Sequence, residues 1–249
     1  IQTKEKVAIK HFIYSKESTD ITFIEQWKRF KREIEIHLSL DHKNIIKARN
    51  FYQKGSKLYL IMDYVEGRTL QNIIDDNNSL DVLDCINLVK QVAEVLQYID
   101  DKGIVHRDIK PGNIWVSSEN QVYVIDFGCA KKMYSESITV ARMLIGTISY
   151  MSPEQLLPNY KELDGRTDIF ALGCTFYYLL TKAFPFKGED IKETINSIFQ
   201  SNPISVRDYN PYVPFKLEYI IHQTLKKDPD HRCPTAKLLT YHLNKILFY

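Results

Sequence analysis

The sequence has no excess of charge of one sign. Its 249 residues include 33 Lys and Arg against 31 Asp and Glu, a formal net charge of +2. A protein that coats nucleic acid usually concentrates basic side chains on one face, so this balance argues against a nucleic-acid partner. Hydrophobic residues make up 44% and charged residues 26% of the chain, which is the composition of a globular protein and not of a disordered one.

Cysteines and long apolar runs are also scarce. The four cysteines form no C-x-x-C pair and no Cys/His cluster with zinc spacing, which favours a reducing, cytoplasmic compartment over a secreted disulfide scaffold. The longest apolar run, Ile169 to Leu180, has twelve residues, whereas a membrane span needs about 20. We therefore expect no membrane segment in this chain, and a buried core helix over that run.

The first quarter of the chain is predicted to be rich in strands. Short apolar runs predict strands at residues 6–10, 51–52 and 58–65. Between them, residues 20–40 carry apolar side chains at helical spacing. This pattern suggests a small β-rich unit over residues 1–65.

The remainder of the chain is predicted to be mostly helical. Residues 81–102 form an apolar helical stripe, and Gly103 is a typical helix-ending residue. A hairpin is predicted to join residues 113–116 to residues 121–125, and helices separated by prolines follow. Residues 66–249 therefore form the larger, helical part.

Four short motifs succeed one another along this chain. They are Val7-Ala8-Ile9-Lys10, the stretch His106-Arg107-Asp108-Ile109-Lys110-Pro111-Gly112-Asn113, Asp126-Phe127-Gly128 after an apolar strand, and Gly146-Thr147-Ile148-Ser149-Tyr150-Met151-Ser152-Pro153-Glu154. Each motif alone is weak. In this order they resemble the eukaryotic-type (Hanks-type) protein kinase family, and the resemblance extends from Lys6 to about Leu239.

The resemblance implies an α+β, bilobal protein-kinase fold. The small β-rich lobe, truncated here, would be residues 1–65 and the large helical lobe residues 66–249. ATP and Mg²⁺ would be the cofactors, and the γ-phosphate would pass to Ser or Thr hydroxyls of protein substrates. Lys110 and the Gly146-Thr147 pair favour Ser/Thr over Tyr as acceptor, and residues 145–155 look most like bacterial members. The resemblance also suggests self-association for autophosphorylation.

Six residues are assigned to ATP by this resemblance, and one of them, Asp126, is also assigned to the metal. Lys10 would hold the α- and β-phosphates, and Glu33 would anchor Lys10. Met62 would be the gatekeeper, while the backbone of Asp63 and Val65 would hydrogen-bond adenine. Lone charged residues usually lie solvated on the surface. Because Lys10 and Glu33 are flanked by apolar residues, we favour the ATP-binding interpretation.

Four residues are assigned to catalysis and metal binding. Asp108 would orient the substrate hydroxyl and accept its proton, and Lys110 would neutralise charge on the transferred phosphoryl group. Asn113 and Asp126 offer the oxygen atoms that suit Mg²⁺.

Three further residues are expected to support the large lobe. By resemblance Asp168 would cap the catalytic loop, and Arg232 would be the buried partner of Glu154. A buried carboxylate needs such a partner because its desolvation is costly.

The chain departs from the family by lacking the glycine-rich loop. No G-x-G occurs anywhere, and nine residues precede Lys10. We expect weak ATP binding by the chain as printed, and the absence supports an alternative, a non-catalytic kinase-fold scaffold or regulatory module. A small-molecule phosphotransferase of the same fold is a third hypothesis. The complete set of charged motif residues argues against the scaffold, and Ser152-Pro153-Glu154 argues for a protein substrate.

Three other residues differ from the family or add a reactive group. Trp115 stands where the family has a Leu-like floor under adenine, so it either reshapes the pocket or packs in the core. His37 lies one turn after Glu33 at a usually apolar position, where it either loosens the helix or is a hydrogen-bonded core histidine. Cys129 could be a reactive thiol or a small inert residue, and we favour the inert residue.

Activation by phosphorylation is the last expectation. Ser137 and Thr139 lie between Asp126 and Glu154, and we favour Thr139 as the site. A phosphate there would bridge Arg107 and Lys131, as the resemblance implies, and fix the loop. The alternative is that these hydroxyls belong to a solvated loop.

Overall fold

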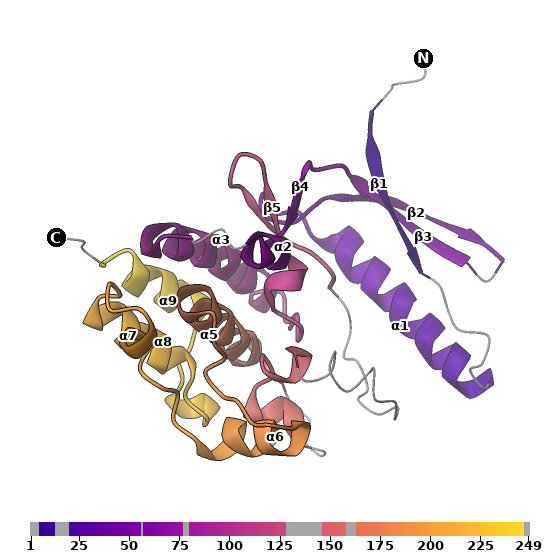
Figure 1. Cartoon of the computed structure of the whole chain (residues 1–249). Helices are drawn as coiled ribbons and strands as arrows, with labels where there is room; N and C mark the ends of the chain where they lie inside the picture. The colour runs from indigo at the N-terminus through magenta and orange to yellow at the C-terminus, as the bar shows by residue number, and fades with distance from the viewer. Residues whose placement is uncertain are drawn as a thin grey trace.

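The computed structural model describes residues 5–12, 20–55, 57–76, 80–127, 146–157 and 163–246, with side chains left undescribed at 20–26 and 29. A small sheet with one long helix lies at one end of the molecule, and a larger helical body lies at the other (Figure 1). Five residues named above lie outside the described residues: Gly128, Cys129, Lys131, Ser137 and Thr139.

The small lobe is an antiparallel sheet of three described strands. Its order is β1 (Val7–Phe12), β3 (Lys57–Asp63) and β2 (Ala48–Lys54). The helix α1 (Asp20–Ser39) runs alongside the sheet (Figure 1). Sheet and helix share a compact apolar cluster, formed by Phe12, Ile34, Ala48, Leu58 and Leu60.

A second small sheet follows the first along the chain. It contains β4 (Gly67–Thr69), β5 (Ile114–Ser117) and β6 (Val122–Val124) in that order. The β5–β6 hairpin confirms the prediction. β4 was not predicted, because three residues with a central arginine carry no apolar pattern. Its partner strand β5 lies more than forty residues further along the chain.

The helices of the large lobe surround a single apolar core. In the described ranges they are α2 (Leu70–Asp75), α3 (Val82–Asp100), α5 (Gly165–Thr181), α6 (Ile191–Gln200), α7 (Val206–Tyr209), α8 (Phe215–Thr224) and α9 (Ala236–Leu243), with short 3-10 turns at Pro111–Asn113, Pro153–Leu156 and Pro229–His231.

The predicted core helix is α5, and thirteen of its seventeen residues are buried. Gly173 lets α5 approach α8 closely, because a Cβ atom at this position would lie 2.1 Å from Thr224 Oγ1. The run from Ile169 to Leu180 is therefore apolar because protein surrounds it on nearly every side. No helix among the described residues is long and apolar enough to cross a lipid bilayer.

The boundaries of α3 follow from its terminal residues. Asp81 accepts a hydrogen bond from the Asp84 N–H and caps the helix start. Gly103 adopts a φ of +68°, and the Ile104 N–H donates to the Ile99 carbonyl at 2.9 Å. This is the left-handed turn that glycine makes without steric cost, so the predicted stop at Gly103 is confirmed.

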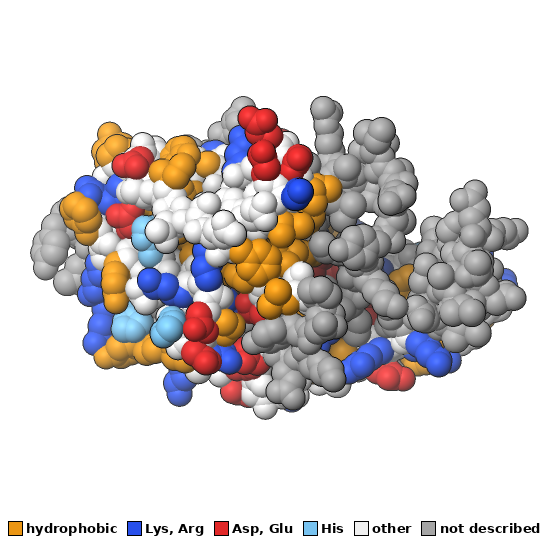
Figure 2. All heavy atoms as spheres, turned by 90° about the horizontal axis from the view of Figure 1, so that it is seen from below, with side chains coloured by type: hydrophobic (Ala, Val, Ile, Leu, Met, Phe, Trp, Pro, Cys, Tyr) orange, Lys and Arg blue, Asp and Glu red, His pale blue; other side chains and the backbone are white. Residues whose placement is uncertain are grey.

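Acidic and basic side chains are interspersed on the described part of the face seen from below (Figure 2). They alternate with hydrophobic and histidine side chains instead of forming a field of one sign. This face matches the near-balanced charge of the sequence.

Candidate active site

Lys10 stands at the centre of a three-residue ion-pair cluster. Its Nζ lies 2.5 Å from Glu33 Oε1 on α1 and 2.7 Å from Asp126 Oδ1, which comes just after β6. The cluster thus joins three elements separated by up to 116 residues in the chain. The arrangement brings together three of the residues that the sequence assigned to ATP.

Lys10 and Asp126 stabilise each other's charged forms, whereas at Glu33 burial outweighs the attraction of Lys10 and raises the pKa of Glu33. Burial by itself would lower the pKa of Lys10, but the carboxylates of Asp126 and Glu33 outweigh it and hold that pKa above its ordinary value. Burial would raise the pKa of Asp126, and the Lys10 ammonium outweighs this effect and lowers it. Lys10 is therefore cationic and Asp126 anionic at neutral pH, which suits phosphate and metal binding respectively.

A second cluster surrounds Asp108. Lys110 Nζ donates to Asp108 Oδ1 at 2.9 Å, and Asn113 Nδ2 donates to Asp108 Oδ2 at 2.8 Å. Asn113 Nδ2 also donates to the Asp108 carbonyl at 2.8 Å. Both carboxylate oxygens are thereby oriented, so Asp108 is held in one position by its neighbours.

Two oxygen donors are available for a metal ion. The Asn113 amide nitrogen is used by Asp108, which leaves Asn113 Oδ1 as the atom for a cation. The Ile125 N–H donates to the Asn113 carbonyl at 3.0 Å, which ties the segment before Asp126 to Asn113. No group of three His, Cys, Asp or Glu side chains in the described ranges could hold a metal by itself. Two oxygens fit Mg²⁺, which usually takes its remaining ligands from phosphate and water.

The backbone of the catalytic loop is strained and held by Asp168. Arg107 adopts a φ of 67°, which is uncommon for a residue other than glycine. The His106 N–H donates to Asp168 Oδ2 at 2.7 Å and the Arg107 N–H to Asp168 Oδ1 at 2.8 Å. Burial raises the pKa of the Asp168 carboxyl to about 7, against the opposing effect of these two donors. The predicted cap of the loop is thus present in the structure.

Phe127 lies between two histidine rings. Its centroid is 5.1 Å from that of His106 and 5.2 Å from that of His37. The His106 Nδ1 accepts from the Asp108 N–H and its Nε2 faces the Ile125 carbonyl, each at 3.3 Å. This pattern requires a neutral ring with hydrogen on Nε2. Burial lowers the pKa of His106 in agreement.

The assigned adenine-binding segment lies at the end of β3. Met62 packs against the apolar cluster of the small lobe. The Asp63 N–H donates to the Lys47 carbonyl at 3.0 Å, so a contact of Asp63 with adenine would have to use its carbonyl. Val65 follows in the link between β3 and β4.

Trp115 lies on the face of β5 that turns away from the large-lobe core. Its neighbours Ile114 and Val116 are buried, whereas Trp115 is half-buried. The indole packs against Gly67, where a Cβ would lie 2.7 Å from Trp115 Nε1. Trp115 Nε1 is buried with no hydrogen-bond partner among the described residues. Of the two alternatives, this placement favours a role in shaping the cleft over packing in the core.

The predicted pair of Arg232 with Glu154 is present and completely buried. The side chains of Arg232 and Glu154 are 0% and 4% exposed. Thr167 Oγ1 also donates to Glu154 Oε1, at 3.0 Å. This pair fixes the segment that carries Ser152 and Glu154 to the turn that ends at Arg232.

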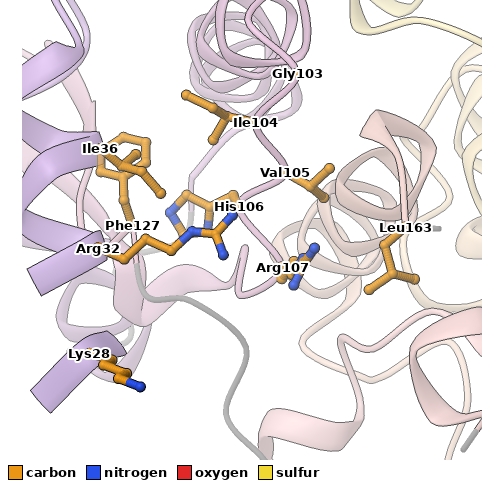
Figure 3. Close-up of a pocket in the computed structure, with 10 residues that line it drawn as sticks. All are labelled: Lys28, Arg32, Ile36, Gly103, Ile104, Val105, His106, Arg107, Phe127 and Leu163. Atoms are coloured by element: carbon orange, nitrogen blue, oxygen red, sulfur yellow. The ribbon is translucent and has the colours of Figure 1, made fainter. Parts of the chain in front are cut away.

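A basic cavity of about 410 Å³ lies between α1 and the catalytic loop. Figure 3 shows Lys28 and Arg32 on α1 on one side and Arg107 on the other. Arg107 Nε is buried without a hydrogen-bond partner in the part of the chain that the structure describes. The sequence had identified Arg107 for phosphate binding but not Lys28 or Arg32. Only the position of Arg32 next to Glu33 could have indicated that it would face this loop.

Known proteins similar to this chain are protein kinases. The family model described as "Protein kinase domain" matches residues 1–243. The chain is 36% identical over 210 residues to the serine/threonine-protein kinase PrkC of Bacillus subtilis (strain 168), covering 84% of this chain and 32% of that protein. It is 32% identical over 213 residues to the serine/threonine-protein kinase PknB of Mycobacterium leprae (strain TN), covering 84% of this chain and 34% of that protein.

Among solved structures, the crystal structure of Rad53 1-466 in complex with AMP-PNP superposes with a TM-score of 0.75. It shares 23% sequence identity and covers 95% of this chain and 57% of that chain. This similarity confirms the bilobal fold predicted from the motifs. The chain spans about a third of the length of the two bacterial relatives.

Proposed function

The chain belongs to the protein kinase family, and from this membership we propose that it transfers the γ-phosphate of ATP to Ser or Thr hydroxyls of protein substrates. The observation that carries the proposal is the Asp108 carboxylate, oriented by Lys110 and Asn113. Such a carboxylate can accept the proton of an attacking hydroxyl. The named serine/threonine kinases among the relatives support Ser/Thr as acceptors.

ATP and Mg²⁺ are the cofactors of this proposal. Lys10 would hold the α- and β-phosphates, while Glu33 keeps the ammonium in place. Asp126 and Asn113 would bind Mg²⁺, which when bound offsets the negative charge of the phosphates. When Asp126 binds the metal instead of Lys10, Lys10 would still be held in place by its ion pair with Glu33.

The proposal also covers the adenine-binding segment at the end of β3 and the bounds of the two lobes. Adenine would lie against Met62 and bind the backbone of Asp63 and Val65. The small lobe would comprise residues 1–65 and the large lobe residues 66–249, because the two sheets separate between β3 and β4.

Activation by phosphorylation at Thr139, with Ser137 as the runner-up, is the regulatory part of the proposal. The basic cavity supports it, since Arg107 lines it together with Arg32. Unphosphorylated, these cations repel one another. A phosphate carries about −1.5 to −2 charges and could bridge α1, Arg107 and Lys131.

The regulatory proposal is tested by phosphate mapping and activity of full-length protein. Thr139→Ala, Arg107→Ala and Arg32→Ala should each reduce turnover, and phosphatase treatment of the parent should do the same. Lys31→Ala is the matched control, because this exposed α1 cation does not line the cavity. Parent-like turnover in Thr139→Ala and Arg107→Ala would overturn this mechanism.

Self-association and location complete the proposal. Autophosphorylation between two copies predicts a rate that rises with the square of protein concentration, whereas phosphorylation within one copy predicts a first-order rate. We place the protein in the cytoplasm, where ATP is available and thiols stay reduced. The free, buried Cys85, Cys174 and Cys233 agree with that compartment.

The activity itself is tested with radiolabelled ATP, Mg²⁺ and a generic protein substrate, using full-length protein. Label on phosphoserine or phosphothreonine supports the proposal. Label only on a small-molecule acceptor indicates a small-molecule phosphotransferase, and nucleotide binding without transfer indicates a scaffold. Either of these last two outcomes would overturn it.

A further inference from the structure

Large aromatic side chains are exposed together on the turn before α8, on α8 and on α9. Tyr212 is 88% exposed, Phe215 72% and Tyr219 64%, and Tyr241 on α9 is exposed as well. Phe215 and Tyr219 lie one helical turn apart, so they share one face of α8. Single exposed rings are common on protein surfaces, whereas a group of them marks an interaction surface.

Three contacts join these rings to basic side chains and to one another. Lys216 Nζ on α8 donates to the Lys245 carbonyl at 2.9 Å, which places the start of α8 beside the end of α9. Lys245 Nζ lies 4.1 Å from the centre of the Tyr241 ring, and the guanidinium carbon of Arg207 lies 3.4 Å from the centre of the Phe215 ring. These contacts create the α8–α9 surface, which consists of Tyr212, Phe215, Lys216, Tyr219, Tyr241 and Lys245.

The α8–α9 surface carries a net positive charge. Residues 236–246 contain two lysines and no acidic residue. The acid of α8, Glu218, accepts a hydrogen bond from Ser205 Oγ at 2.5 Å, which directs it toward the start of α7. On α7 itself, Arg207 and Asp208 balance each other. The lysines of α8 and α9 therefore suit a negatively charged partner.

A lipid surface suits these features better than a protein does. Two copies of the chain that met through this surface would bring lysines against lysines, which like-charge repulsion opposes. Protein partners usually anchor their central side chains in pockets, and two cavities of the described residues lie elsewhere, one beside the catalytic loop and one between α3 and the β5–β6 hairpin. Exposed rings mixed with lysines are instead typical of the boundary between water and an anionic bilayer.

We propose that the α8–α9 surface binds the surface of a bilayer that contains anionic phospholipids. Tyr212, Phe215 and Tyr219 enter the headgroup layer, while Lys216 and Lys245 lie against the lipid phosphates. The contact is peripheral, and none of the described helices has to cross the bilayer. Because α8 and α9 lie on the side of the large lobe away from the small-lobe sheet (Figure 1), the bound protein keeps the candidate active site free. The inference does not depend on the proposed kinase function.

The first test maps the surface by amine labelling of full-length protein, with mass spectrometry to measure the label on each lysine. Vesicles of phosphatidylcholine with phosphatidylglycerol should protect Lys216 and Lys245 from an amine-reactive reagent. Lys54 is the internal control, because it is exposed on β2 in the small lobe. Vesicles of phosphatidylcholine alone, or soluble glycerol phosphate, should leave the labelling of these lysines as it is in buffer.

Three outcomes of the labelling would overturn the proposal. The first is that anionic vesicles leave the labelling of Lys216 and Lys245 unchanged. The second is equal protection by soluble glycerol phosphate, which would identify a phosphate site and not a lipid surface. The third is protection that needs no vesicles and rises with protein concentration, which would identify a second copy of the chain as the partner.

Substitutions then measure the contributions of charge and ring, with the vesicle concentration that half-protects Lys245 as the readout. Lys216→Ala should raise this concentration about fivefold, the effect of one basic residue near an anionic surface. Phe215→Ala should raise it about tenfold, because the ring no longer leaves water on binding. Lys54→Ala and Tyr52→Ala remove an exposed lysine and an exposed ring from β2 and should match the parent. Parent-like protection in Lys216→Ala and Phe215→Ala, with melting temperatures equal to the parent's, would overturn the proposal.

Discussion

Arg232 and Glu154, 78 residues apart in the chain, meet through two parallel hydrogen bonds of 2.7 and 3.0 Å. The other three donors of the guanidinium go to the carbonyls of Arg166, Lys226 and Lys227. All five N–H groups of Arg232 are therefore used. A lysine could not replace this planar set of contacts.

Removing Arg232 should destabilise the large lobe strongly. Arg232→Ala leaves the Glu154 carboxylate buried and without its partner, which costs about 3–5 kcal/mol. Arg166→Ala is the control, since Arg166 pairs with the more exposed Asp164 and Asp230 and should cost less than about 1 kcal/mol. Thermal denaturation measures both, and an unchanged melting temperature in Arg232→Ala would count against the pair.

The same pair predicts how stability depends on pH. Burial alone would raise the pKa of Glu154, but the Arg232 guanidinium outweighs burial and lowers it below the ordinary 4.5. As the pH falls, Glu154 is therefore protonated in the unfolded chain before it is protonated in the folded protein. The stability that the ionised pair contributes above pH 4.5 is lost as the pH falls through the folded-state pKa of Glu154.

Glu154→Gln isolates this contribution. The parent should exceed the variant in unfolding free energy by a constant amount at neutral pH, and the difference should shrink below pH 4.5. Urea denaturation at a series of pH values measures it. A difference that stays constant down to acid pH would show that Glu154 titrates as in the unfolded chain.

Asp126→Ala should abolish Mg²⁺-dependent nucleotide binding without unfolding the protein. The Asp126 side chain is 45% exposed, and Lys10 keeps its bond to Glu33. Calorimetric titration with and without Mg²⁺ measures the effect, with the exposed Asp41→Ala as control. If the variant binds Mg²⁺–nucleotide like the parent, the metal ligands lie elsewhere.

Trp115→Leu distinguishes the two roles considered for the indole. Because Trp115 lies on the side of β5 away from the core, the shorter side chain should leave the melting temperature nearly unchanged. It should tighten nucleotide binding several-fold by vacating space in the cleft. A large drop in melting temperature with unchanged nucleotide affinity would identify Trp115 as a core residue.

Sequence patterns predicted those features whose signal lies within one segment. The helix predicted at 20–40 is α1 at Asp20–Ser39, and α3 ends at Asp100, three residues before the predicted stop at Gly103. Motif spacing also predicted which charges would gather, since Lys10, Glu33 and Asp126 form one cluster. These signals are local in sequence or come from family resemblance.

Other features depend on contacts with backbone atoms, which leave no trace in residue types. The acceptor of His37 is a carbonyl at Ile46, and any residue there would supply it. The left-handed conformation of Arg107 is imposed by Asp168, whereas a sequence signals that conformation only through glycine. β4 escaped prediction because its partner strand is distant in the chain.

We expect Asp108 to serve phosphate transfer and not nucleotide binding. The decisive measurement is single-turnover transfer from ATP to a protein substrate by full-length parent and Asp108→Asn, with ATP affinity measured in parallel. We expect equal affinity and a transfer rate about 10²–10⁴-fold lower in the variant. A variant that transfers phosphate at the parent rate would contradict the role of Asp108 as the catalytic carboxylate.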